Sequence, residues 1–199
     1  MSLKNSEIIL ATQNKDKIRE IRKILGYHFK IVTLKNFPEI IEDGKTLEEN
    51  AIKKAKTIFK ITKITSIADD SGLEVDFLDG KPGVYSARFA GKNCKYEDNN
   101  KKLLKLLKDV HYKKRKAKFT TVVAIVFEDG SIKTTSGSVY GYITTEPKGN
   151  NGFGYDPIFY YPKLKKTFAQ LTTQQKNKIS HRAIAFKKVK KLLEAEIRD

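Results

Sequence analysis

The order of apolar runs and helical periods near the start of the chain constrains the fold more than any other feature. Residues 8–11 form a short apolar run that indicates a buried strand. Between residues 18 and 25, isoleucine and leucine recur at the spacing of one helix face, and residues 29–33 indicate a second strand. A strand, a helix and a strand in this order require a right-handed crossover between parallel strands. The sequence therefore predicts a mixed α/β fold.

Later segments continue this alternation. A long helix is predicted from Thr46 to about residue 62, because Thr46 and Glu49 have the spacing of a capping box. Residues 66–69 indicate a short buried strand that ends in acidic side chains. Residues 119–127, apolar on both faces, are typical of a central strand, and the Asp-Gly pair after them predicts a tight hairpin. Because no repeat or linker divides the chain, we expect one domain over residues 1–199.

The chain is strongly basic, with 40 Lys and Arg residues against 23 Asp and Glu residues and a formal net charge of +17. Such a charge would suit a polyanionic partner. The lysines are spread along predicted helices and loops, without an RNP-type aromatic motif or zinc-finger spacing, so we expect a solvated surface and no specific nucleic-acid binding. A nucleic-acid-binding module stays open as a rival class. Its affinity would fall steeply with salt and would not depend on Mg²⁺.

A single cysteine, Cys94, excludes an intrachain disulfide and indicates a reducing, cytoplasmic location. No segment of the sequence approaches the ~18 uninterrupted apolar residues that a membrane span needs. We therefore expect a soluble protein that has no membrane partner.

Polar residues gather at the start of the first predicted helix. Asn14 stands where an N-cap is expected, which places Lys15 and Lys17 in the first turn, where the helix dipole disfavours cations. In one interpretation these are solvated lysines, and Asp16 partly offsets their cost of about 0.3–1 kcal/mol. In the other, helix N–H groups, Asn14 and an ammonium form a phosphate-binding site, and only a bound phosphate compensates the repulsion between the lysines and the helix dipole. In that case Lys17→Ala would not lower the stability of the empty protein.

Acidic residues follow the strand predicted at 66–69. The string Asp-Asp-Ser-Gly occupies residues 69–72, and two adjacent carboxylates repel each other, which favours a bound cation or solvent. The same string is also typical of an ordinary turn. Glu42 and Asp43, before the long helix, would bring further oxygen ligands if the fold placed them nearby.

Glycine and aromatic residues alternate in residues 151–159. Gly152 and Gly154 flank Phe153, which allows the backbone to approach a flat ligand beside an aromatic ring. A glycine-rich turn before a strand at residues 157–159 is the alternative interpretation.

Basic side chains surround the start of the last predicted helix, after Ser180. They are Lys178, His181 and Arg182. Cations at a second helix N-terminus are a coincidence, or they indicate that both helices face one anion. A phosphate receptor, an acidic metal site and a glycine-aromatic pocket together indicate hydrolysis of a nucleotide by a metal-activated water.

Five motifs occur in an order typical of one known family. They are ATQNKDKIREI, EDGKTLEENAIKKA, ADDSGLEVDFLDGKPGVYSARFAG, NGFGYDPIF and LTTQQKNKISHRAIAF. From residue 8 to the last helix the sequence resembles the Ham1-like inosine/xanthosine triphosphate pyrophosphatases. The resemblance implies an elongated α/β domain with a central mixed β-sheet, flanking helices and a nucleotide cleft between two lobes, usually in a homodimer. It also implies Mg²⁺-dependent hydrolysis of ITP, dITP and XTP to the monophosphate and pyrophosphate, which keeps deaminated purines out of nucleic acid.

The resemblance implies roles for individual residues. The triphosphate-binding loop corresponds to Thr12, Gln13, Asn14, Lys15, Asp16 and Lys17, with Gln13 in place of a smaller residue. Asp70 corresponds to the general base and to a metal-bound carboxylate, and Ser71 to a substrate contact. The segment for base and sugar corresponds to Phe153, Gly154, Tyr155, Asp156, Lys176, His181 and Arg182. For the second metal carboxylate we choose Glu42 over Glu49, whose capping-box position supplies a structural role.

Within that segment, His181 and Arg182 are expected to donate hydrogen bonds to the 6-oxo group of the purine. The Maf-like pyrophosphatases, which act on modified pyrimidine or methylated nucleotides, share much of the implied fold and are the alternative enzyme class. The Ser-His-Arg string at residues 180–182 argues against them.

Overall fold

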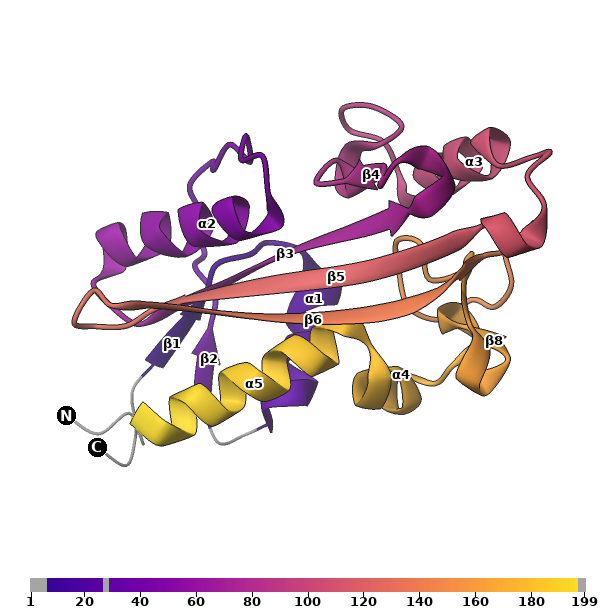
Figure 1. Cartoon of the computed structure of the whole chain (residues 1–199). Coiled ribbons are helices and arrows are strands. Elements are labelled where there is room, and N and C mark those ends of the chain that lie inside the picture. The colour runs from indigo at the N-terminus through magenta and orange to yellow at the C-terminus, as the bar shows by residue number, and fades with distance from the viewer. Residues whose placement is uncertain (1–6, 27–28, 197–199) are drawn as a thin grey trace. The chain divides into compact units, whose positions relative to one another are not determined.

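The computed structural model describes residues 7–26 and 29–196 (Figure 1). Its strands are β1 (Glu7–Leu10), β2 (Lys30–Val32), β3 (Ser66–Val75), β4 (Pro82–Gly83), β5 (Lys116–Val126), β6 (Ile132–Ile143), β7 (Phe159–Tyr161) and β8 (Lys166–Thr167). Its α-helices are α1 (Lys15–Leu25), α2 (Leu47–Thr62), α3 (Tyr96–Leu106), α4 (Thr173–Ile179) and α5 (His181–Glu196).

The strands form one sheet in the order β2-β1-β3-β5-β6-β7-β8, with β4 paired to β3. β1 runs parallel to both β2 and β3, with Ile9 opposite Val32 on one side and Ser66 on the other. The pairs β3–β4, β6–β7 and β7–β8 are antiparallel. The predicted α/β class and its central mixed sheet are therefore confirmed.

Local sequence signals position several element boundaries. Thr46 caps α2, because its side chain accepts the Glu49 N–H at 3.1 Å. Between β5 and β6 the chain reverses at Gly130, whose φ of 82° lies in the region that favours glycine. The strand predicted at residues 157–159 begins only at Phe159, as β7. Residues 154–158 form a turn instead, in which the Tyr155 carbonyl accepts backbone N–H groups.

β3 is longer than the sequence predicts. The interpretation of residues 69–72 as a turn is wrong, because β3 continues through the Asp-Asp-Ser-Gly string to Val75. Its second half pairs with β4, where Leu73 lies opposite Gly83. A buried strand accommodates charged side chains only when other elements supply opposite charges.

The chain divides into two compact units. Unit 1 comprises the described parts of residues 1–70, 121–137 and 181–199, and unit 2 comprises residues 71–120 and 138–180. β3, β5 and β6 each contribute residues to both units. The assignment of residues 1–199 to a single domain stays a prediction.

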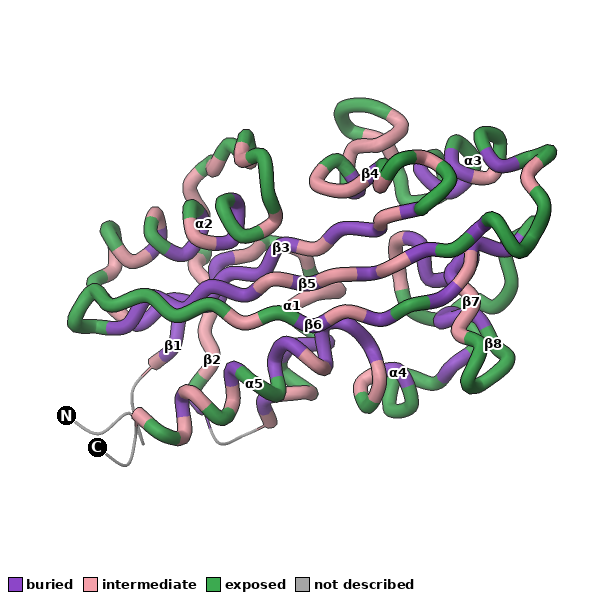
Figure 2. The backbone as a smooth tube through the Cα atoms, viewed as in Figure 1, coloured by how far each residue is buried: buried purple, intermediate pink, exposed green. Residues whose placement is uncertain are grey.

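In unit 1 an apolar core lies on each face of the sheet. Ile8, Leu10 and Ile67 pack with the apolar faces of α1 and α5. Ile9 and Ala68 point to the other face and pack with α2, as the alternation of side chains along a strand requires. Figure 1 shows α2 and α5 on opposite faces of these strands, and Figure 2 shows that the strands between them are largely buried.

In unit 2 a group of aromatic rings packs within the core. The Phe159 ring centroid lies 4.7 Å from that of Phe119 and 4.9 Å from that of Phe168. Arg115 is also buried, and its guanidinium donates to the backbone carbonyls of Leu107 and Thr144. This arginine thus links the C-cap residue of α3 to the residue that follows β6.

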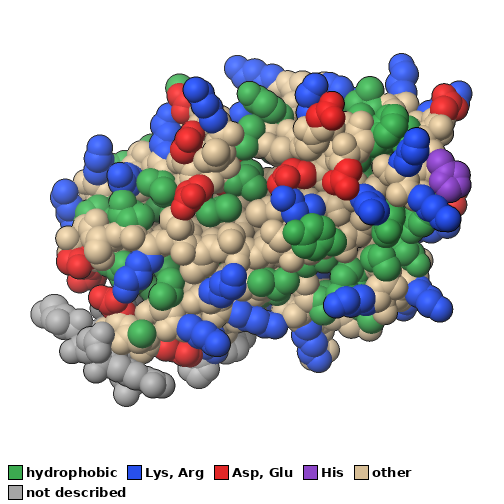
Figure 3. Space-filling model, viewed as in Figure 1, with side chains coloured by type: hydrophobic (Ala, Val, Ile, Leu, Met, Phe, Trp, Pro, Cys, Tyr) green, Lys and Arg blue, Asp and Glu red, His purple; other side chains and the backbone are tan. Residues whose placement is uncertain are grey.

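On the face that Figure 3 shows, basic side chains are distributed over the surface and do not gather in one patch. This distribution agrees with the expected solvated surface. Among the described residues, none of the helices combines the length and the apolar character that crossing a membrane requires.

Candidate functional site

Two side chains shape the loop between β1 and α1. The Thr12 hydroxyl accepts the Asn14 N–H at 3.2 Å. Asn14 Oδ1 accepts the N–H groups of Asp16 and Lys17 at 3.0 and 3.1 Å, so the predicted N-cap is confirmed. The exposed residues of this loop are Gln13 and Lys15. The cap thus fixes the first turn of α1, from which the Lys17 side chain extends.

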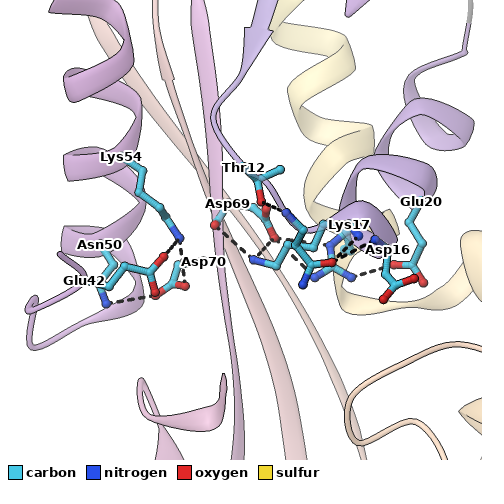
Figure 4. Close-up of polar contacts among 11 residues, drawn as sticks. Thr12, Asp16, Lys17, Glu20, Glu42, Asn50, Lys54, Asp69 and Asp70 are labelled. Carbon is cyan, nitrogen blue, oxygen red and sulfur yellow. Dashed lines mark hydrogen bonds and ion pairs between the residues drawn. The ribbon is translucent and has the colours of Figure 1, made fainter. Parts of the chain in front are cut away.

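Lys17 turns inward to β3. Its Nζ lies 3.0 Å from Asp69 Oδ2 and donates to the Asp69 carbonyl at 3.4 Å (Figure 4). Burial lowers the pKa of Lys17, and Lys54 and Arg182 add to this effect, whereas Asp69 opposes it. The expectation that only a bound phosphate would compensate this lysine is therefore wrong, because Asp69 already supplies the opposite charge.

Asp69 joins Lys17 to a second buried ion pair. Arg182 donates from Nε and Nη2 to Asp69 Oδ2, each at 3.4 Å, and from Nη1 to Glu20 Oε2 at 2.7 Å. Burial would raise the pKa of Asp69, but Lys17 and Arg182 outweigh it and hold the pKa well below its usual value. Lys17, Asp69, Arg182 and Glu20 thus form one chain of alternating charges within unit 1, which we call the Asp69 cluster.

Asp70 belongs to a separate group on the α2 side of the strand, the Asp70 cluster. Asn50 Nδ2 donates to Asp70 Oδ2 at 3.1 Å, and Lys54 Nζ lies 3.3 Å from Asp70 Oδ1 and 2.7 Å from Glu42 Oε1. Burial raises the pKa of Asp70 and Glu42 adds to the rise, while Lys54 and Lys17 partly counter it. Burial would lower the pKa of Lys54, but Asp70 and Glu42 outweigh it, so this pKa is raised.

Glu42 and Asp70 both pair with the Lys54 ammonium. Glu49 is exposed, and its side chain accepts the Lys45 N–H at 2.7 Å, not the Thr46 N–H that a capping box requires, so only the Thr46 half of the predicted box forms. The described residues contain no group of three or more His, Cys, Asp or Glu side chains that could hold a metal. Mg²⁺ commonly takes one or two carboxylates and completes its oxygen ligands with substrate phosphates and water. The pair of Glu42 and Asp70 fits that requirement.

Residues 153–156 of the predicted base and sugar segment form a tightly bonded loop in unit 2, which also contains Lys176, whereas His181 and Arg182 belong to unit 1. Asp156 accepts the Phe153 N–H at 2.8 Å and pairs with Lys176, whose ammonium lies 4.8 Å from the centroid of the Phe153 ring. Tyr155 is buried and donates to the Ser86 carbonyl at 2.9 Å, and the Gly154 carbonyl accepts from an asparagine. The structure thus brings Phe153, Asp156 and Lys176 together.

Gly152 is required for this loop. Its φ is 74°, and a Cβ at this position would lie 2.0 Å from Asp156 Oδ2. Two other predicted contacts lie elsewhere: Ser71 follows Asp70 on β3 and is half-buried, and His181 is buried at the start of α5.

Sequence reasoning did not find Glu20, Asn50, Lys54 or the structural role of Asp69. Signals for the helical residues were present. Glu20 lies one turn after Lys17 on the face that includes Ile21, and Lys54 lies on the face of α2 that includes Ala51 and Ala55. A charged residue on a buried helix face requires a buried partner.

The chain is similar to known proteins over nearly its whole length. The model of the Ham1 family matches residues 8–192. The dITP/XTP pyrophosphatase of Thermoanaerobacter pseudethanolicus is 50% identical over 188 residues, which are 92% of this chain and 94% of the relative. The dITP/XTP pyrophosphatase of Bacillus subtilis is 48% identical over 193 residues, 95% of this chain and 98% of the relative. Among solved structures, the Staphylococcus aureus Ham1 protein is 44% identical, with a TM-score of 0.86 over 96% of this chain and 99% of its own.

Proposed function

Because the chain belongs to the Ham1 family, we propose that it hydrolyses dITP, ITP and XTP to the nucleoside monophosphate and pyrophosphate and so removes deaminated purines from the nucleotide pool. The observation that carries this proposal is the buried carboxylate of Asp70, held by Asn50 and sharing an ammonium with Glu42. A fixed carboxylate with a raised pKa is suited to accept a proton from water.

In the proposed reaction, water attacks phosphorus, the bond between the α- and β-phosphates breaks, and Asp70 takes the proton of the water. Lys17 and the N-terminus of α1 bind phosphate oxygens, with the loop of Thr12, Asn14 and Asp16 already shaped by its own hydrogen bonds. Glu42 and Asp70 would hold Mg²⁺, which supplies positive charge to the triphosphate. Gln13 and Lys15, in the same loop, are also proposed to contact the triphosphate.

We further propose that Ser71, Phe153, Gly154, Tyr155, Asp156, Lys176, His181 and Arg182 contact the substrate. The pairing of Asp156 with Lys176 below the Phe153 ring would support an aromatic surface for the purine. A purine contact of Arg182 would add an acceptor to a guanidinium that already donates to Glu20 and Asp69. A homodimer, a cytoplasmic location and a nucleotide cleft between two lobes also stay proposals.

A nucleotide panel with pyrophosphate detection tests this function. We expect kcat/KM to be highest for dITP, ITP and XTP, lower for GTP and lowest for ATP, because a 6-amino donor facing a protein donor costs ~1–3 kcal/mol per buried group. Each nucleotide is assayed with Mg²⁺ and with excess chelator. Equal hydrolysis of ATP and ITP would contradict the substrate class, and full activity in chelator would contradict the metal requirement.

A further inference from the structure

The Lys54 ammonium lies between the two carboxylates proposed to hold the metal. Its Nζ is 2.7 Å from Glu42 Oε1 and 3.3 Å from Asp70 Oδ1, and only 8% of the side chain is exposed. These two acids come from different segments, the loop before α2 and strand β3. Lys54 therefore pairs with both of them within unit 1.

The carboxylate of Asp70 is fixed independently of Lys54. Asp70 Oδ2 accepts from Asn50 Nδ2 at 3.1 Å, and Asn50 Oδ1 in turn accepts the Gly44 N–H at 2.8 Å. A Cβ on residue 44 would lie 2.6 Å from Asn50 Oδ1, so glycine permits this close approach. A lysine side chain has four rotatable carbon bonds, whereas Asp70 is held by a backbone-anchored amide. When a second cation enters, the lysine is therefore the group that moves.

We propose that Lys54 is a resident counter-ion that competes with Mg²⁺ for Glu42 and Asp70 and leaves both carboxylates when the metal binds. Metal oxygen ligands lie at 2.0–2.1 Å from Mg²⁺, and the ammonium occupies the space between the same oxygens (Figure 4). Two unscreened positive charges cannot share this buried position. The inference rests on the metal assignment of the proposed function, and it predicts weak metal binding by the nucleotide-free protein.

Titration of the full chain with Mn²⁺, followed by electron paramagnetic resonance without nucleotide, tests the competition. Mn²⁺ prefers the same oxygen ligands as Mg²⁺. Lys54→Met should tighten Mn²⁺ binding by about tenfold or more, because the competing charge is removed from a buried site. The matched control is Lys53→Met, which removes the same charge one position earlier on α2, where Lys53 pairs with Asp43 at the surface. We expect the control to change the affinity by less than about twofold.

Unchanged or weaker Mn²⁺ binding in Lys54→Met, equal tightening in both variants, or no binding by any of the proteins would overturn the proposal. Should Lys54→Met fail to fold, a crystal structure of the wild-type protein with Mn²⁺ decides the question. We expect Lys54 Nζ beyond hydrogen-bond distance of both carboxylates, and persistence of both contacts beside bound Mn²⁺ would overturn the proposal. Hydrolysis of dITP by the wild-type protein is measured separately, so that a failure of the enzymatic assignment is distinguished from a failure of the competition.

Discussion

Asp69 and Asp70 follow one another on β3, yet their side chains point to opposite faces of the sheet and meet different partners. Asp69 lies on the face of Ile67, towards α1 and α5, and contacts Lys17 and Arg182. Asp70 lies on the face of Ala68, towards α2, and contacts Asn50 and Lys54. The strand alternation thus separates two carboxylates that the sequence places side by side.

The two carboxylates also differ in the direction of their pKa shifts. For Asp69, burial is outweighed by Lys17 and Arg182, so the pKa falls well below its usual value. For Asp70, burial is only partly countered by Lys54 and Lys17, so the pKa rises. A carboxylate with a strongly favoured charge is suited to hold cations in place, whereas one with a disfavoured charge is suited to accept a proton. The comparison therefore predicts a structural role for Asp69 and a chemical role for Asp70.

The largest effect on stability is expected for Asp69→Asn. The substitution removes the carboxylate between two buried cations, Lys17 and Arg182, so the free energy of unfolding should fall by about 3–5 kcal/mol. Urea unfolding at neutral pH measures this change. The control is Asp43→Asn, which affects an exposed ion pair with Lys53 and should have little effect. A loss below about 1 kcal/mol in Asp69→Asn would show that this cluster does not stabilise the fold.

The opposite behaviour is expected for Asp70→Asn. The amide has the same size but cannot take a proton, so turnover of dITP should fall by ~100-fold or more. The free energy of unfolding should stay unchanged or rise, because the charged form of Asp70 is disfavoured in the folded protein and Lys54 keeps Glu42 as a partner. Pyrophosphate release and urea unfolding measure the two quantities. Comparable activity would remove Asp70 from the mechanism, and a large loss of stability would erase the contrast with Asp69.

Lys17→Ala should affect binding and stability together. The earlier expectation that stability is unaffected considered only the helix dipole, whereas the structure shows a buried ion pair with Asp69. Loss of this charged partner is expected to cost about 1–3 kcal/mol of unfolding free energy, partly offset by removal of a cation from the start of α1. If Lys17 also binds phosphate, KM for dITP should rise. Lost stability with unchanged kinetics would restrict Lys17 to the structural role of the Asp69 cluster.

Those parts of the fold that depend on nearby residues could be predicted from the sequence. The cap at Asn14, the cap at Thr46 and the hairpin at Gly130 each involve residues a few positions apart. The extension of β3 beyond residue 69 could not be predicted in this way. It depends on cations from three helices, and their approach to the strand is a result of tertiary packing.

The same distinction, between features set by nearby residues and features set by tertiary packing, applies to the candidate site. The family resemblance pointed to Asp70, Glu42 and Lys17, but it did not indicate which charges these residues meet in the folded chain. Arg182 is 113 residues from Asp69, and Lys54 is 16 residues from Asp70. Partners at such separations leave no periodic signal, apart from a charged residue on an otherwise apolar helix face.

The smallest effect is expected in the pH dependence of stability, where the two carboxylates should differ in sign. The pKa of Asp69 is lowered by folding from its ordinary value of 3.8. Its charge therefore stabilises the folded state above pH 3.8, and this contribution is lost as the pH falls below that value. The pKa of Asp70 is raised by folding above its ordinary value of 3.8. The protonated form therefore favours folding at low pH, and this contribution is lost as the pH rises from 3.8 through the pKa of the folded protein. As the pH falls from neutral to pH 4, the free energy of unfolding of the wild-type protein should therefore rise relative to that of Asp70→Asn. Relative to that of Asp69→Asn it should stay constant. Urea unfolding of the three proteins across this range measures both differences, and a parallel change in the two would mean that the neighbouring carboxylates titrate as one group.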